Sequence, residues 1–320
     1  MSVPSAVEPH AAPAASTSPP ASGAPGPWTT RRLMAWMTEA FGRKGLDAPR
    51  LSAEILVSRV LGCERLRLYT DPDRPASPAE LQTLRDLVGR ALKHEPVQYL
   101  TAEAWFFGLP LLVDRRVLIP RPCTELIVEH VLQHARASTA HRSPDAGPVR
   151  IADVCTGSGC IAVALARHLP AAEILAADLS ADALDVTAAN AARHGVADRV
   201  EFLRGDLLDA LPDRVTAGLD YLVSNPPYIS DAEWADVPPN VRDHEPELAL
   251  RGGPDGLSLV RRLIEHAPGW LRPGGVLLVE CAASNAGRAA ELARSTAGLT
   301  AVSVLRDLEG HDRVVAAQRA

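Results

Sequence analysis

The chain has 320 residues, of which 47% are hydrophobic and 22% are charged, so it is long enough to bury a large core. Its net charge of -6 argues against broad attraction to the phosphate backbone of nucleic acids, which requires clustered Lys and Arg. The composition therefore indicates a globular protein. It disfavours a nucleic-acid substrate without excluding one.

The five cysteines form neither a Cys-x-x-Cys pair nor a Cys/His array with the spacing of a zinc site. The sequence therefore predicts no metal site and favours a reducing compartment. Cys155 and Cys160 lie beside a tight turn and the start of a helix, where small buried hydrophobic residues are more common than redox or metal-binding thiols. We interpret both as packing residues.

Residues 1–27 consist almost entirely of Ala, Pro, Ser, Gly and Thr, which predicts a disordered tail. No Lys or Arg precedes Arg31, whereas a secretory leader begins with a basic segment. No run approaches the roughly 18 apolar residues of a membrane-spanning helix. We therefore expect a cytoplasmic protein without a membrane partner.

Apolar residues recur at helical spacing over residues 33–41 and again over residues 51–60. A third helix is predicted after Ser77, because Ser77 and Glu80 form a capping box around a proline at the first helical position. Residues 28–94 are therefore expected to form a small helical domain.

Aromatic and β-branched residues, interrupted by Gly and Pro, fill residues 99–120 and predict a β-hairpin. We expect this hairpin to form a linker, residues 95–122, between the helical domain and a second domain, residues 123–320. A helix is expected near residues 124–136, followed by a loose segment at residues 137–148.

From Val149 onward, predicted strands and helices alternate, which is typical of an α/β fold with a mostly parallel, doubly wound sheet. The last two strands, at residues 301–305 and 313–317, have no helix between them and predict an antiparallel C-terminal hairpin. The other strands are expected at residues 150–154, 174–177, 200–204, 221–224 and 275–281. The helices are expected from residue 159, from residue 181 and near 256–270.

The segment from Asp153 to Gly159 lies where the first of these strands passes into a helix. Its glycines allow the backbone to approach a ligand closely, and the free N–H groups of the helix start can bind a carboxylate. Read alone, the segment fits an ordinary tight turn equally well. It also lacks the third glycine of the dinucleotide-binding pattern, where Ala162 stands.

Asp178 lies at the end of the next predicted strand and Asp206 lies just after the one that follows it, so both would face the same crevice. A carboxylate at Asp178 can accept both hydroxyl groups of a ribose, and one at Asp206 can accept an adenine amino group. A single Asp at a strand end is usually a helix cap. Together with Asp153, three acidic strand ends favour a nucleoside ligand.

The most specific motif is Asn225-Pro226-Pro227-Tyr228, directly after a predicted strand. The prolines stiffen the strand exit, the Asn225 amide matches the edge of a planar amide or an aminopurine, and the Pro226 carbonyl is a second acceptor. Tyr228 offers a ring on which a flat acceptor can lie. The alternative, a proline turn that only ends a strand, explains less of this pattern.

An amide nitrogen is a poor nucleophile, because its lone pair is delocalised into the carbonyl. Acceptors at Asn225 and Pro226 would bind its two hydrogens, favour positive charge on the nitrogen and aim it at a methyl donor. Asn225, Pro226 and Tyr228 are therefore the predicted catalytic residues. Pro227 is expected to complete the substrate-binding pocket with them.

Together these residues resemble the HemK-type protein N5-glutamine methyltransferases. The similarity extends from about Trp28 to the C-terminus. Besides the two motifs above, it rests on residues 96–101, 117–122, 244–250 and 252–256. The resemblance implies a class I (Rossmann-like) methyltransferase domain, S-adenosyl-L-methionine as the cofactor, and an N-terminal helical domain that recognises a protein substrate. The cofactor-binding residues that it implies are Cys155, Thr156, Gly157, Ser158, Gly159, Asp178, Asp206, Leu207 and Asn225.

The family acts on peptide-chain release factors, in translation termination, or on a large-subunit ribosomal protein. Cys123 stands where the release-factor branch usually has an acid, and residues 103–106 and 155–160 look more like the ribosomal-protein branch. Residues 119–122 and 310–315 look like the release-factor branch, which we favour.

Two other functions stay open at this point. Adenine-N6 methylation of nucleic acid would suit the same motif, but it should come with a basic surface, which the mixed charges of the N-terminal helices do not provide. A scaffold that has lost catalysis is disfavoured by the intact Asn225 and Tyr228. His244 and Glu245 are expected to belong to a segment that covers the acceptor pocket, and no chemistry is assigned to them.

Overall fold

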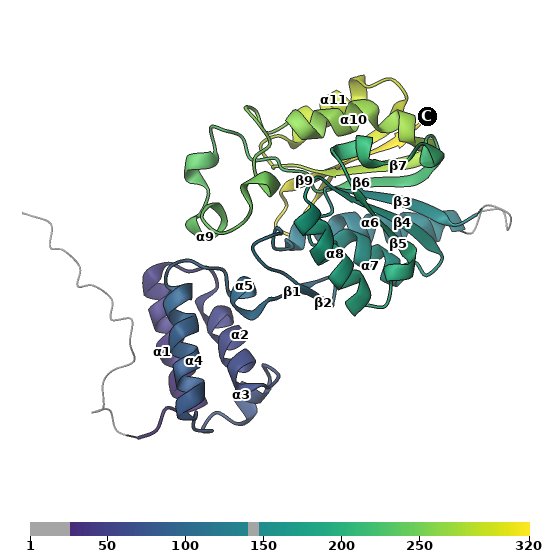
Figure 1. Ribbon diagram of the computed structural model, residues 1–320. Coiled ribbons are helices and arrows are strands. Elements are labelled where there is room, and N and C mark those ends of the chain that lie inside the picture. The colour runs from purple at the N-terminus through teal and green to yellow at the C-terminus, as the bar shows by residue number, and fades with distance from the viewer. Residues whose placement is uncertain (1–25, 140–146) are drawn as a thin grey trace, which may run out of the picture. The chain divides into compact units, whose positions relative to one another are not determined.

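The computed structural model describes residues 26–139 and 147–320 (Figure 1). Almost all of the expected N-terminal tail, and most of the loose segment at 137–148, lie outside the described residues. The chain divides into two compact units between Thr101 and Ala102. In the described ranges, no helix is both long and apolar enough to cross a membrane.

The first unit is helical, and the three helices predicted for it are confirmed. Their apolar faces meet in a core that includes Met37, Phe41, Leu56, Leu84 and Val88. Two short helices, α3 and α5, were not predicted. The helices of this unit are α1 (Thr30–Lys44), α2 (Pro49–Leu61), α3 (Arg67–Thr70), α4 (Pro78–Ala91) and α5 (Val97–Thr101).

The predicted capping box starts α4. The Ser77 hydroxyl accepts the Glu80 N–H at 3.3 Å, and the Glu80 carboxylate accepts the Ser77 N–H at 2.7 Å. The Arg74 guanidinium donates to the other Glu80 oxygen at 2.7 Å. This ion pair, with the Ser77 bonds, lowers the pKa of Glu80 to about 2.

The second unit opens with a β-hairpin of β1 (Glu103–Phe106) and β2 (Leu109–Leu112). It is shorter than the expected stretch of residues 99–120. The chain is helical before it because the N–H groups of Tyr99 and Leu100 bond the Pro96 carbonyl. At its other end, the Asn190 side chain bonds both the N–H and the carbonyl of Leu112, which occupies the backbone groups that a longer strand would need.

The predicted doubly wound sheet is confirmed. Its seven strands have the order β5-β4-β3-β6-β7-β9-β8, with parallel pairing from β5 to β7 and antiparallel pairing of β9 to both neighbours. The C-terminal antiparallel hairpin was therefore predicted correctly. The strands are β3 (Val149–Val154), β4 (Ala172–Asp178), β5 (Val200–Arg204), β6 (Leu219–Ser224), β7 (Leu271–Glu280), β8 (Leu299–Arg306) and β9 (Asp312–Arg319).

Helices cover both faces of this sheet (Figure 1). One core lies between the sheet and α6, α7 and α8, and the other lies between the sheet and α10 and α11. The helix α11 was not predicted. The helices are α6 (Glu125–Thr139), α7 (Cys160–His168), α8 (Ala181–Arg193), α9 (Pro239–Arg242), α10 (Ser258–Trp270) and α11 (Ala286–Ser295). Short 3-10 turns are η1 (Pro122–Thr124), η2 (Ala197–Arg199), η3 (Leu207–Ala210), η4 (Asp213–Val215), η5 (Trp234–Asp236) and η6 (Glu247–Ala249).

The strand order reverses between β3 and β6, because the chain proceeds outward from β3 to β5 and then returns to the other side of β3. Val154 pairs with Ser224 at the carboxyl ends of these strands, and the Ser224 hydroxyl donates to the Val154 carbonyl at 2.6 Å. Ligands of open α/β sheets bind at such a reversal. The segment from Asp153 to Gly159 and the motif at Asn225 therefore begin side by side.

Candidate active site

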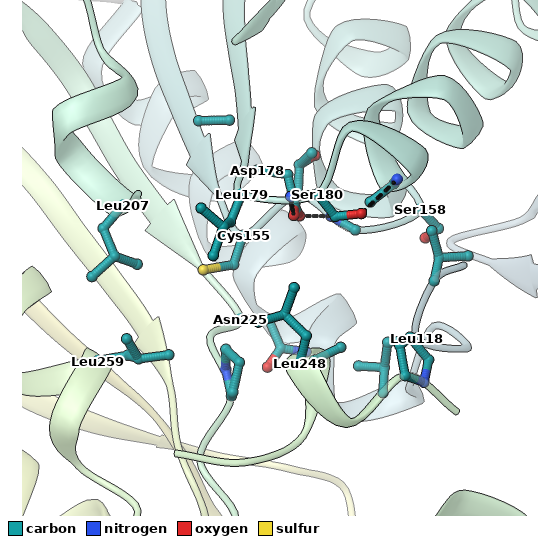
Figure 2. Close-up of a pocket in the computed structure, with 18 of the residues that line it drawn as sticks. Leu118, Cys155, Ser158, Asp178, Leu179, Ser180, Leu207, Asn225, Leu248 and Leu259 are labelled. Carbon is teal, nitrogen blue, oxygen red and sulfur yellow. Dashed lines mark hydrogen bonds between the residues drawn. The ribbon is translucent and has the colours of Figure 1, made fainter. Parts of the chain in front are cut away.

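A cavity of about 580 Å³ opens at the carboxyl ends of the parallel strands, within the size range of small-molecule sites (Figure 2). It collects most of the residues that the sequence singled out. Gly159, Pro226 and Tyr228 are not part of its lining among the described residues. The predicted residues that line it are Cys155, Thr156, Gly157, Ser158, Asp178, Asp206, Leu207, Asn225 and Pro227.

The turn after β3 depends on left-handed backbone conformations. Cys155, Gly157 and Gly159 have φ values of 61°, 57° and 77°. A Cβ atom on Gly159 would lie 2.6 Å from the Thr187 Cγ2 atom, so no larger residue fits there without movement. The Thr187 hydroxyl in turn donates to the Gly157 carbonyl at 2.8 Å. The turn is thus packed tightly against α8.

Asp153, near the end of β3, stabilises this turn through hydrogen bonds of its carboxylate. Its carboxylate is fully buried and accepts the Thr156 hydroxyl at 2.7 Å and the Ala162 N–H at 3.1 Å. Burial raises its pKa to about 7. Its Oδ1 atom has no hydrogen-bond partner among the described residues. Asp153 does not line the cavity, unlike the other two acidic strand ends.

Asp178 lies at the cavity wall and already accepts two backbone N–H groups, from Gly157 and from Ser180, each at 2.9 Å (Figure 2). Burial raises the pKa of its carboxyl group, and these backbone bonds oppose the rise. A carboxylate has about four acceptor positions. Asp178 therefore keeps capacity to accept hydroxyl groups of a ligand.

Asp206 and Leu207 contribute differently to the wall. Asp206 forms an ion pair with Arg262 at 2.9 Å, and about half of its side chain is exposed. Leu207 is buried and has a positive φ of 50°. Leu207 and Leu259 lie on one side of the cavity, and Ser158 lies on the other (Figure 2). Apolar walls of this kind suit a flat aromatic ring.

Asn225 belongs to a hydrogen-bonded chain that runs from the cavity wall, through Thr124, which also lines the cavity, to the buried Glu280. Its Nδ2 atom donates to the Thr124 hydroxyl at 3.1 Å, and that hydroxyl donates to the Glu280 carboxylate at 2.7 Å. The Tyr228 hydroxyl donates to the other oxygen of Glu280 at 3.2 Å, and the Cys123 thiol approaches the same atom at 3.6 Å. Burial raises the pKa values of Glu280, Tyr228 and Cys123.

The segment after α9, residues 243–249, which includes His244 and Glu245, contributes four residues to the cavity lining. The backbones of Ile229 and Gly252 are joined by a hydrogen bond of 2.8 Å, next to a bridge between Ile229 and Arg251. Glu245 is buried, and its carboxylate accepts hydrogen bonds from the Arg121 guanidinium at 2.6 Å and from the Ile119 N–H at 3.1 Å. The cavity residues from this segment are Pro246, Glu247, Leu248 and Ala249.

Cys155 and Cys160 both line the cavity and are partly buried against apolar residues. Burial raises the pKa of each thiol. Thiols of this kind stay neutral at physiological pH and are poor nucleophiles and metal ligands. Their placement agrees with the packing role inferred from the sequence.

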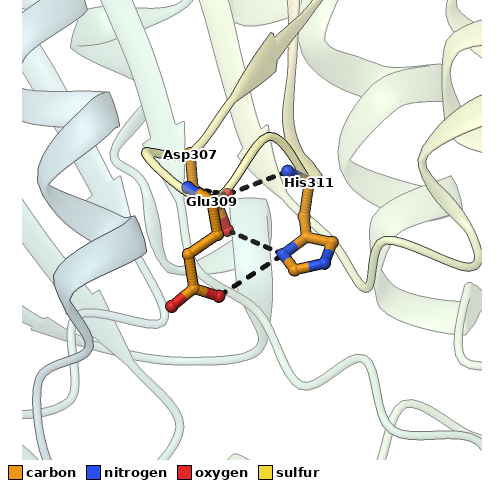
Figure 3. Close-up of side chains that lie close together, drawn as sticks. All are labelled: Asp307, Glu309 and His311. Carbon is orange, nitrogen blue, oxygen red and sulfur yellow. Dashed lines mark hydrogen bonds and ion pairs between the residues drawn. The ribbon is translucent and has the colours of Figure 1, made fainter.

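Asp307, Glu309 and His311 bring their side chains together in the turn between β8 and β9 (Figure 3). The Asp307 carboxylate is already engaged: it accepts the backbone N–H groups of Glu309 and His311 and an Arg313 N–H at 2.8 Å. These bonds account for the cluster as a stabilised turn.

Sequence reasoning missed Thr124 and Glu280, the two residues behind Asn225. Glu280 carries a recognisable signal, because it is an acid at the carboxyl end of the strand next to β6. Thr124 carries none, since it belongs to a short 3-10 turn without periodicity. Leu248 was also missed as an individual residue, although its segment was expected at the pocket.

The two units match known protein families. Residues 32–101 match the family described as PrmC N-terminal domain, and residues 126–237 match the methyltransferase small domain. A release factor glutamine methyltransferase of Chlorobaculum tepidum is 45% identical over 89% of this chain and 96% of its own length. Proteins with the same name from Rhodopirellula baltica and Geobacter sulfurreducens are 38% and 40% identical, over 92% and 90% of this chain and 97% and 96% of their own.

A solved structure with the same fold is the hMettl16 catalytic domain in complex with MAT2A 3'UTR hairpin 6. It has a TM-score of 0.50 and 16% identity, and the match covers 78% of this chain and 85% of that one. At this identity the likeness concerns the fold alone. It confirms the class I methyltransferase fold that the sequence predicted.

Proposed function

Because this chain belongs to the release factor glutamine methyltransferase family, we propose that it methylates a glutamine side chain of a peptide-chain release factor. The N5 atom of that glutamine would take the methyl group from the sulfonium of S-adenosylmethionine, forming an N–C bond as the S–C bond breaks. S-adenosylhomocysteine would leave, and the nitrogen would release one of its two protons to water. The observation that carries the proposal is the position of Asn225 in the cavity wall, with its Nδ2 atom bound to Thr124.

The residues of the cavity fit the cofactor. Asp178 has acceptor capacity left for the ribose hydroxyl groups, and Leu207 and Leu259 offer apolar walls for the adenine. Gly157 lines the cavity without a side chain, so a ligand can approach the turn after β3 closely. S-adenosylmethionine supplies an electrophilic methyl group when bound. Asp206 is the weakest member of the set, because Arg262 already occupies one side of its carboxylate.

Asn225 and Pro226 would act on the acceptor. The Asn225 Oδ1 atom is available on the side away from Thr124, and it would accept one hydrogen of the glutamine amide. We propose that the carbonyl group of Pro226 accepts the other, although Pro226, like Tyr228, is not part of the cavity lining among the described residues. Together they would hold the nitrogen in one direction and favour the positive charge that develops on it. Pro227 would complete the pocket wall.

Tyr228 would act indirectly, without contacting the glutamine. Its hydroxyl is fixed on Glu280, and its ring does not line the cavity among the described residues. We propose that Tyr228 supports the backbone of Asn225 and Pro226 instead of lying beneath the acceptor.

The helical unit, which ends at Thr101, would contact the release factor outside the glutamine, and the match of residues 32–101 to the PrmC N-terminal domain supports this. The names of the relatives favour a release factor over a ribosomal protein as the substrate. Release factors act where translation terminates, so we propose the cytoplasm as the compartment.

The decisive experiment incubates the purified chain with methyl-labelled S-adenosylmethionine and separate candidate acceptors. These are a release factor, the same factor with its target glutamine replaced by Ala, a large-subunit ribosomal protein, and DNA or RNA. We expect label in the unaltered release factor alone. Label only in nucleic acid, or equal label in the Ala control, would overturn the proposal.

A second experiment tests the role of Asn225. The variant Asn225→Ala should lose transfer by at least about 100-fold, the usual scale for a lost electrostatic contact to the reacting group, while binding S-adenosylmethionine nearly as well as the unaltered chain. Binding is measured by calorimetric titration and transfer by label incorporation. An unchanged rate would remove Asn225 from the catalytic role.

A further inference from the structure

We propose that Thr124 and Glu280 are positioning residues that fix the orientation of the Asn225 side-chain amide, so that its oxygen faces the glutamine side chain that is methylated. An amide presents an acceptor on one side and a donor on the other, and rotation by half a turn exchanges them. Only the oxygen of Asn225 can accept a hydrogen bond from the NH2 group of the glutamine that is methylated. The inference rests on the proposed function and adds two residues to its mechanism.

The first step concerns the proton of Thr124. The Glu280 carboxylate is fully buried, and three neutral groups converge on it: the Thr124 hydroxyl, the Tyr228 hydroxyl and the Cys123 thiol. The hydrogen bonds of these three groups favour the ionised form of Glu280 and oppose the rise in its pKa that burial causes, and an ionised carboxylate only accepts hydrogen bonds. At 2.7 Å, the bond to Glu280 therefore takes the single hydroxyl proton of Thr124.

The second step concerns what Thr124 can still offer. Once its proton is bound to Glu280, the hydroxyl oxygen has only lone pairs left for other partners. It can accept from Asn225 and cannot donate to it. The Nδ2 atom of Asn225 must then face Thr124, as it does at 3.1 Å, and the Oδ1 atom faces away from Thr124.

The third step concerns rigidity. Thr124 lies in η1, Glu280 ends β7 and Asn225 follows β6, so three separate elements hold the chain of bonds. Thr124 and Glu280 are 1% and 0% exposed, which leaves little room for water to exchange the partners. The same carboxylate also fixes the Tyr228 hydroxyl, on the other side of the two prolines. One buried acid thus orients both ends of the motif.

The test compares Thr124→Val, Thr124→Ser and Glu280→Gln with the unaltered chain, in transfer to the release factor. Val keeps the shape of Thr and removes the hydroxyl, Ser keeps the hydroxyl, and Gln gives Thr124 a partner that can also donate. Thr296→Val is the matched control, because Thr296 also bonds through its hydroxyl, to the Leu292 carbonyl, but lies away from the cavity.

We expect Thr124→Val and Glu280→Gln to lower kcat at least tenfold, equivalent to about 1.4 kcal/mol, with the KM for S-adenosylmethionine within twofold of the unaltered chain. Thr124→Ser should recover most of the rate, and Thr296→Val should not change it. A merely structural role would lower stability and raise KM, without rescue by Ser.

A Thr124→Val rate within threefold of the unaltered chain, or a Ser variant no faster than the Val variant, would overturn the role of Thr124. A Glu280→Gln rate equal to that of the unaltered chain would do the same for Glu280. These outcomes are distinct from failure of the proposed function, which would appear as absent transfer to the release factor by the unaltered chain.

Discussion

The turn after β3 offers a sharp test of how packing sets cofactor binding, through the variant Gly159→Ala. An added Cβ atom would lie 2.6 Å from Thr187 Cγ2 and 3.3 Å from Thr187 Cα, at a φ of 77°. Gly195→Ala is a matched control, because Gly195 follows α8 with a φ of 65° and has no atom within 4 Å of the same position.

Two contributions to the free energy of unfolding are common to both variants, and a third applies to Gly159→Ala alone. A left-handed conformation costs a residue other than glycine about 1–2 kcal/mol, and both variants bear that cost. The gain from a stiffer unfolded chain, about 0.4–1 kcal/mol, is also common to both. Overpacking against Thr187 adds about 1–3 kcal/mol to Gly159→Ala alone. The difference between the variants should therefore lie in that last range.

Urea unfolding of the full chain, followed by circular dichroism, gives the free energy of unfolding of each variant. Calorimetric titration with S-adenosylmethionine gives the second measurement. Because Thr187 must move, its bond to the Gly157 carbonyl should weaken, and cofactor affinity should fall for Gly159→Ala and not for Gly195→Ala. Equal losses of stability in the two variants, or equal affinities, would refute the reasoning.

Three further predictions follow from contacts described above. Gly252→Ala would place a Cβ atom 2.7 Å from Tyr228 Cα, so we expect the free energy of unfolding, measured with urea, to fall by about 1–3 kcal/mol. Because the backbone at Tyr228 must shift, kcat/KM for the release factor should fall as well, and an unchanged value would contradict the reasoning. The ion pair of Glu80 with Arg74 lowers the pKa of Glu80 to about 2, so its stabilisation is complete above the unfolded value near 4.5 and is lost as the pH falls towards 2. Glu80→Gln should accordingly melt at a lower temperature than the unaltered chain at pH 7, by the equivalent of roughly 0.3–1 kcal/mol, and at the same temperature near pH 2. Burial raises the pKa of Cys123 to about 11, so iodoacetamide at pH 8 should label Cys123 much more slowly than free glutathione, as followed by mass spectrometry, and equal rates would contradict this.

The sheet, and the gathering of most candidate site residues at one of its edges, could be predicted because their signals are local. Segments of five to seven residues that are rich in apolar side chains, each followed by a turn, form the strands β3 to β6, and the residues after them must then meet at one edge. Asp178 and Asn225 were found in this way. The capping box at Ser77 could be predicted for the same reason, since it depends on two residues three positions apart.

The rest depended on contacts between distant segments. The core face of α11 consists of Ala286, Ala289, Ala290 and Ala293, which are too small to give a clear hydrophobic period. The hairpin ends at Leu112 because Asn190, 78 positions away, takes its backbone groups. Thr124 meets Glu280 across 156 positions, and no pattern near either residue indicates that contact.

The pairing of Val154 with Ser224 has a consequence for selectivity. The turn proposed to bind the cofactor starts one residue after Val154, and the motif proposed to bind the glutamine starts one residue after Ser224. The distance between these two segments is therefore set by the spacing of neighbouring strands, about 4.8 Å. The backbone hydrogen bonds between β3 and β6 keep this spacing the same for every protein substrate. Discrimination among proteins must then come from parts that can vary independently of the sheet, such as the segment around Leu248.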